Sequence, residues 1–113
     1  MSRDWRLRAE DILAACERAR TFLGELDLDA FRADARTASA VPHQIFVIGE
    51  AASRLPEDIR QRAPEVPWRE IIGMRNVIAH GYFEVDVEVP WKTVRLDLPV
   101  LEEAVRRLLE AAA

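Results

Sequence analysis

Four side chains that can take part in chemistry lie close together between Arg75 and Tyr82. On a helix, Asn76 and His80 are about one turn apart and share one side, while Arg75 and Tyr82 are two turns apart and share the neighbouring stripe. A histidine has an unperturbed pKa of about 6.5, so it can accept or donate a proton near neutral pH. An arginine can hold the oxygens of a phosphoryl group. The stretch therefore predicts proton transfer beside a bound anion.

The helix that carries these residues is predicted to begin at Pro67 or Trp68. It is predicted to end at Gly81, because glycine favours the left-handed conformation found just after helix ends. Its inner stripe consists of Trp68, Ile71, Ile72, Arg75, Ile78 and Ala79. Arg75 is the exception among these apolar side chains. A guanidinium there needs a carboxylate, a phosphate or a water-filled cleft to offset its desolvation.

Two longer amphipathic helices are predicted before this one. Apolar residues at alternating spacings of three and four predict the first helix over about residues 4–25, with Asp4 or Ser2 as its N-cap. After a turn, the same spacing runs without a change of register over residues 31–55. Because it passes through Pro42, we expect one long helix that bends at the proline.

The remaining segments also favour helices. One or two helical turns are predicted over residues 57–62. Residues 83–89 alternate apolar and acidic side chains like a strand, but no second strand is predicted to pair with them, so we expect an extended acidic connection. Helical spacing resumes over residues 91–111, with a predicted break at Pro99. The 113 residues thus predict one all-α domain, 1–113, a bundle of four or five helices.

Composition limits the classes of partner and the cellular location. The formal net charge is −4, so the chain is not a typical nucleic-acid binder, and any site for a polyanion must come from a local cluster of arginines. Cys16 is the only cysteine and lies on an apolar stripe, so it can form neither an internal disulfide nor a Cys-based zinc site. No secretion signal or membrane span is found. We expect a cytoplasmic protein with no membrane partner.

The extended motif resembles that of the HEPN superfamily and, within it, the HepT-like ribonuclease toxins. Their signature is Arg, four to six residues, His, any residue, Tyr, and it is complete here at Arg75, His80 and Tyr82. The similarity covers nearly the whole chain. It includes residues 48–52, residues 67–74, Trp91 and residues 97–99.

This resemblance implies a helical-bundle homodimer in which two copies of the motif face each other across one cleft. The implied activity is that of an endoribonuclease toxin that cleaves RNA without a metal or other cofactor. Arg75 and His80 would be the catalytic residues, and Asn76 would support the imidazole or a phosphate oxygen. The implied partner is a small nucleotidyltransferase antitoxin that uses ATP to attach AMP to Tyr82, as in type VII toxin–antitoxin systems.

The residue types give a physical reason for a shared site. Cleavage of RNA without a metal needs one group to activate the ribose 2′-OH and another to protonate the departing 5′-oxygen. One chain supplies one suitable histidine, His80, because His43 is far away in sequence and is expected at the surface. A two-fold dimer supplies two. Gly49 and the bend at Pro42 are the predicted dimer contact, since a helical glycine permits close approach by another helix or another chain.

Other interpretations of the same residues stay open at this point. The fold could serve as a non-catalytic interaction module that binds a nucleotidyltransferase and presents nucleotide or RNA to it. The acidic net charge favours that alternative slightly. A plain helical dimer is the third possibility, in which Arg75 forms a structural bridge to a carboxylate such as Glu50 and His80 bonds an unpaired carbonyl at the helix end.

Overall fold

The computed structural model of the protein describes residues 4–81 and 86–112. Helices account for most of this part of the chain, and it contains no strand. The long helices are α1 (Trp5–Leu23), α3 (Ala35–Ser53), α5 (Trp68–Ala79) and α7 (Leu98–Ala112); the short ones are α2 (Leu28–Ala33), α4 (Glu57–Gln61) and α6 (Glu88–Lys92). A π-helical turn, Thr93–Asp97, joins α6 to α7. The prediction of an all-α bundle of four or five helices is confirmed in its class: four long helices build it, and the described residues add three short ones.

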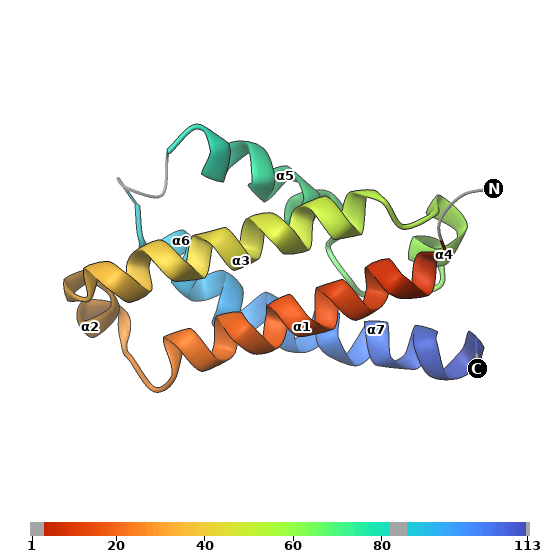
Figure 1. Cartoon of the computed structure of the whole chain (residues 1–113), viewed down its shortest axis with the longest axis horizontal. Helices are drawn as coiled ribbons and strands as arrows, with labels where there is room; N and C mark the ends of the chain where they lie inside the picture. The colour runs from red at the N-terminus through yellow and green to blue at the C-terminus, as the bar shows by residue number, and fades with distance from the viewer. Residues whose placement is uncertain (1–3, 82–85, 113) are drawn as a thin grey trace.

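Helices α1, α3 and α7 form the centre of the bundle, and α5 lies at its periphery. Helix α1 packs on both α3 and α7, whereas α5 packs on α3. Figure 1 shows α5 along one side of α3, with α1 and α7 on the other side. Within α5, Ile71 is the one residue that is buried. The helix that carries the chemical motif is therefore peripheral, and much of its surface faces solvent.

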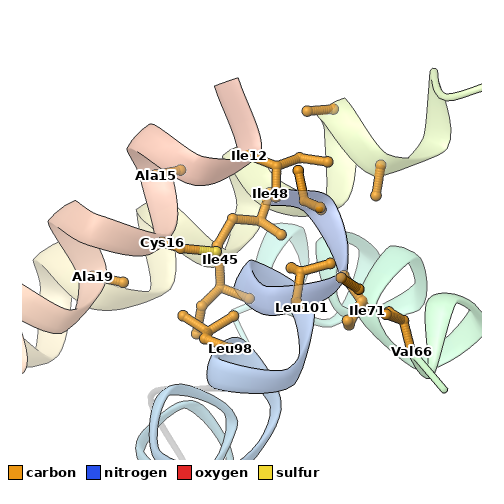
Figure 2. Close-up of a cluster of buried hydrophobic side chains, with 14 of the residues drawn as sticks. Ile12, Ala15, Cys16, Ala19, Ile45, Ile48, Val66, Ile71, Leu98 and Leu101 are labelled. Carbon is orange, nitrogen blue, oxygen red and sulfur yellow. The ribbon is translucent and has the colours of Figure 1, made fainter. Parts of the chain in front are cut away.

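The core is built from small and branched apolar side chains. Figure 2 shows Ile12 and Cys16 of α1 against Ile45 of α3 and Leu98 and Leu101 of α7. Burial of such side chains is the main favourable contribution to folding. Cys16 is completely buried, and burial raises the pKa of its thiol far above the ordinary value. It is a core residue rather than a reactive one.

Side-chain caps define where the first helices begin. Asp4 caps α1, as predicted, by accepting a hydrogen bond from the backbone N–H of Arg6. The prediction of one helix over residues 31–55 is wrong, because the chain breaks at Asp34. The Asp34 carboxylate accepts hydrogen bonds from the backbone N–H and the hydroxyl of Thr37 and so begins α3. Helix α3 then continues through Pro42 to Ser53.

The C-terminal third differs from the sequence prediction in two places. Glu88 and Val89 belong to α6, so they are not part of an extended connection; residues 83–85 of that predicted segment lie outside the described residues. Pro99 does not break a helix but occupies the first turn of α7, directly after the π-helical turn. The irregularity comes earlier, as the π-helical turn. In the described residues, no helix is both long enough and apolar enough to span a membrane.

Candidate functional site

The C-terminal end of α5 has the predicted form. The helix ends at Ala79, His80 is its C-cap, and Gly81 has a φ of +75°, a conformation in which glycine is not strained. The N–H of Gly81 donates to the carbonyl of Ile78 at 3.0 Å. His80 therefore lies at the exposed terminus of the helix.

Arg75 meets the carboxylate that its position requires. Its Nη1 donates to Oε1 of Glu50 at 2.8 Å and to Oγ of Ser53 at 3.1 Å, both on α3. The Arg75 and Glu50 side chains are 34% and 38% exposed, so this is a partly hydrated ion pair at the seam between α3 and α5. Ser53 was not predicted from the sequence. Its spacing of three residues from Glu50 places it on the same side of α3.

Gly49 determines how closely α5 can approach this ion pair. A Cβ added at Gly49 would lie 3.1 Å from the carbonyl oxygen of Ile71 and 3.3 Å from Cβ of Arg75. The close approach expected at this glycine is therefore made by α5 of the same chain. Because Gly49 is buried by that helix, the prediction that it contacts a second copy is wrong.

The ion pair engages Arg75 through a single nitrogen. A guanidinium has five N–H donors in a planar fork, and two of them lie on Nη1. Within residues 4–81 and 86–112, Nε and Nη2 of Arg75 have no hydrogen-bond partner. Since the side chain is about one-third exposed, these donors can reach an anion from solvent while Nη1 stays bound to α3.

The imidazole of His80 is held by its own helix. Its Nδ1 lies 2.6 Å from the backbone carbonyl oxygen of Asn76, which also accepts the backbone N–H of His80. A carbonyl can only accept, so Nδ1 carries a proton and donates it. In the neutral ring Nε2 is then the basic nitrogen. Asn76 thus orients the imidazole through its backbone, while its exposed side chain can still contact a ligand.

The chain does not bring all predicted residues together. Arg75 and His80 are five residues apart on one helix, which separates them by about 140° around the axis and 7.5 Å along it. Arg75 faces α3, and His80 lies at the open end. Tyr82 lies outside the described residues. His43 is exposed on α3, as expected.

Comparison with known proteins identifies the family. Residues 12–108 match the family described as Ribonuclease HepT-like. The chain belongs to the HepT-like family of the HEPN superfamily. A protein of Thermococcus cleftensis named "Probable ribonuclease HepT" is 40% identical to this HepT-like chain over 108 residues, which cover 96% of this chain and 98% of that protein.

Two further relatives of this HepT-like chain are named as candidate RNases. One, from Caldanaerobacter subterraneus, is 34% identical over 89% of this chain and 90% of its own length. The other, from Methanocaldococcus jannaschii, is 33% identical over 91% of this chain and 94% of its own length. No solved structure was found to match. The relatives agree in a ribonuclease name, and each match covers 90% or more of the relative, so nearly the whole HepT-like domain is shared.

Proposed function

We propose that this protein is a metal-independent endoribonuclease toxin whose active site is shared between the two chains of a homodimer. The observation that carries the proposal is the state of Arg75: one nitrogen is anchored on α3, and the remaining donors reach solvent at the edge of the motif helix. Family membership and the ribonuclease names of the relatives agree with it. RNA is the substrate, and the protein acts in the cytoplasm.

The proposed reaction needs two proton transfers at one phosphate. Nε2 of His80 in one chain takes the proton from the ribose 2′-OH, and O2′ bonds to phosphorus. The bond from phosphorus to O5′ then breaks, and the protonated His80 of the partner chain gives a proton to O5′. Arg75 holds the non-bridging oxygens, whose negative charge grows in the transition state. The products are a 2′,3′-cyclic phosphate and a 5′-OH end.

Gly73 supports the homodimer. It lies in the middle of α5, and an added Cβ would meet no described atom outside the helix within 4 Å. Glycine inside a helix costs about 1 kcal/mol relative to alanine. Packing among the described residues gives no reason for that cost, in contrast to Gly49. Close approach by α5 of a second copy would explain it and would bring the two motifs together.

Neutralisation is proposed to occur at Tyr82, two residues after His80 in the sequence. A partner nucleotidyltransferase would transfer AMP from ATP to the phenol oxygen and release pyrophosphate. The added phosphate would compete with RNA for Arg75, and its negative charge would weaken the attraction that RNA needs. If Tyr82→Phe were still fully neutralised by the partner enzyme, this part of the proposal would fail.

The first experiment compares induced expression of the wild type, Arg75→Ala and His80→Ala, each with and without the partner enzyme. Growth and RNA integrity are followed together. We expect growth arrest with RNA cleavage from the wild type alone, and neither effect from the two variants. Arg62→Ala is the matched control, since it removes an exposed arginine from the end of α4 without touching the motif.

A mixing experiment tests whether the site is shared. Purified wild-type and His80→Ala chains are exchanged in equal amounts, and the rate of RNA cleavage is measured. If both histidines are needed, only wild-type pairs cleave, and the rate falls to roughly one quarter of that of the same total amount of wild-type protein. A site contained in one chain would give about one half. Mixing with Arg62→Ala should leave the rate unchanged.

The non-catalytic interaction module is the second candidate. It is favoured by the occupied Arg75–Glu50 bridge together with the net charge of −4. Under this alternative, folded, dimeric and unmodified wild-type protein would bind the nucleotidyltransferase but leave RNA intact. That result would replace the ribonuclease proposal.

A further inference from the structure

A groove next to Arg75 is not used by the chemistry proposed above. It has a volume of about 610 Å³ and lies between α5 and the segment formed by α4 and the loop after it. Arg75 and Asn76 line one end, and Trp68, at the start of α5, also lines it. Volumes of this size are typical of sites for small organic ligands. The groove therefore begins where the proposed phosphate contact ends.

The lining combines positive charge with apolar surface. Three arginines, Arg60, Arg69 and Arg75, oppose one acidic residue, Glu57. This is a local reversal of sign in a chain whose net charge is −4. Trp68, Ile72 and Pro64 supply the apolar part of the lining. Such a surface suits a ligand with a flat apolar part joined to an anion, which describes a nucleotide.

Trp68 is fixed before any ligand arrives. Its indole N–H donates to the carbonyls of Arg60 at 3.1 Å and Ala63 at 3.0 Å. Because that N–H is the only polar group of an indole, the part of the ring that lines the groove is carbon. A ring held in place by two hydrogen bonds loses little freedom when a base packs on it. Trp68 is thus a preformed apolar surface.

Two exposed polar side chains at the groove can recognise a ligand. The Gln61 amide and the Arg69 guanidinium have no hydrogen-bond partner among the described residues. The amide offers both donors and an acceptor, as the edges of nucleobases do, so it can distinguish one base from another. The guanidinium can bind a phosphate oxygen or stack on a base.

We propose that this groove binds the nucleoside adjacent to the scissile phosphate, with the base against Trp68 and Ile72 and its edge near Gln61. The inference rests on the proposed ribonuclease function, because Arg75 would hold the phosphate to which that nucleoside is attached. Trp68 and Arg75 are seven residues apart, or about 10.5 Å along the helix, a span that one nucleotide can bridge. The groove would then give the enzyme a base preference on one side of the cut.

A second copy of the chain is the competing occupant. In a two-fold interface a patch meets its own copy, so a groove lined by three arginines and one glutamate would bring like charges together. Anionic RNA offsets those charges, whereas a second copy does not. The structure therefore favours a nucleotide in the part of the groove between Trp68 and Gln61. The proposed chain-to-chain contact at Gly73 borders that part, because Gly73 also lines the groove.

The test uses the full-length His80→Ala chain, in which cleavage cannot interfere with binding. The indole N–H signals of its tryptophans are followed by NMR during titration with AMP, GMP, CMP, UMP and ribose 5-phosphate. A His80→Ala, Trp68→Phe double variant assigns the Trp68 signal. We expect that signal to move, with one nucleotide binding at least about fivefold more tightly than the other three and about tenfold more tightly than ribose 5-phosphate.

A matched pair of variants locates the contact. Gln61→Ala should weaken the preferred nucleotide about five- to tenfold and reduce the differences between bases. Arg69→Ala should weaken all four nucleotides by a similar factor. Arg62→Ala makes the same charge change beside the groove but does not line it, and it should leave binding unchanged.

Three results would overturn the proposal. One is no movement of the Trp68 signal up to about 10 mM nucleotide. Another is equal binding of all four nucleotides and ribose 5-phosphate, which would indicate a phosphate site only. The third is a Trp68 signal that responds to protein concentration and not to nucleotide, which would place a second copy in the groove. Failure of the ribonuclease proposal looks different: nucleotides would bind while wild-type protein left RNA intact.

Discussion

Among the described residues, two arginine–glutamate pairs join one helix to another, and they differ in how much of the arginine they use. Arg20 of α1 binds Glu102 of α7 through Nε at 2.6 Å and Nη2 at 2.7 Å, and the carboxylate is 5% exposed. Arg75 of α5 binds Glu50 of α3 through Nη1 alone at 2.8 Å, and that carboxylate is 38% exposed. The first pair is bidentate and closed to water on the carboxylate side. The second is monodentate and partly hydrated.

The difference separates a structural pair from a candidate functional one. Both oxygens of Glu102 are engaged by Arg20, and Arg106 approaches one of them at 3.4 Å, so that carboxylate is fully used by the fold. Arg75 is anchored at one nitrogen, which fixes its direction, while its other donors remain at the solvent edge. A pre-oriented guanidinium with donors to spare can bind a developing negative charge without reorganisation.

The largest expected effect is on catalysis. Under the proposed ribonuclease function, Arg75→Ala should lower the rate of RNA cleavage about 100- to 1000-fold, because it would remove the donors assigned to the charged transition state. The free energy of unfolding should fall by less than about 1 kcal/mol, since a partly exposed pair contributes little. Steady-state cleavage of a short single-stranded RNA and urea denaturation measure the two quantities. Arg75→Lys keeps the charge but loses the planar fork of donors, so its cleavage rate should lie between the rates of the wild type and Arg75→Ala.

Arg20→Ala should show the opposite pattern. It leaves the buried Glu102 carboxylate with only the longer contact to Arg106, and we expect the free energy of unfolding to fall by about 2 kcal/mol, or roughly 8 °C in Tm. Cleavage per folded molecule should stay close to that of the wild type. Equal losses of activity in the folded Arg20→Ala and Arg75→Ala proteins would remove the distinction between the two pairs.

Sequence patterns predict this fold well where the cause is local. The N-cap of α1 at Asp4 and the end of α5 at Gly81 each depend on a single residue type at a helix end. Apolar spacing does not predict the break at Asp34, because Phe31 and Ala38 lie on the same stripe on either side of it. A helix N-cap depends on a single carboxylate, and the spacing of apolar residues does not reveal it.

The candidate site is predicted less completely because its partners are distant in the sequence. The motif names Arg75 and His80, and the apolar stripe around Arg75 already requires a compensating group. Nothing in the spacing decides how Glu50, 25 residues away, would bind, or that Ser53 would share the guanidinium. Gln61 and the groove arise only when α4 is folded against α5. Geometry, rather than residue type, distinguishes the two ion pairs.

Glu50→Gln tests whether the anchor positions Arg75 for catalysis. The amide keeps an oxygen that can accept from Nη1 but loses the charge, so we expect cleavage to change about three- to tenfold and the unfolding free energy by less than about 1 kcal/mol. The effect should appear mainly in kcat, because a misdirected guanidinium affects the transition state more than RNA binding. Recovery of most of the rate in Glu50→Asp would support positioning; a change confined to KM would argue against it.

Asp97 contrasts with the two glutamates that are paired with arginines. It is a half-buried carboxylate whose surroundings include another carboxylate. Burial, and then the negative charge of Glu70, raise its pKa above the ordinary value. Between the ordinary and the raised pKa the folded state binds more protons than the unfolded state, so stability falls as pH rises through that window.

Asp97→Asn should remove this fall and raise the unfolding free energy at pH 7 by up to about 0.5 kcal/mol. Urea denaturation between about pH 3.5 and about pH 7 checks the slope. An unchanged pH dependence in Asp97→Asn would mean that other groups produce it. A loss of stability would mean that Asp97 is paired in the folded protein and is a structural carboxylate like Glu102.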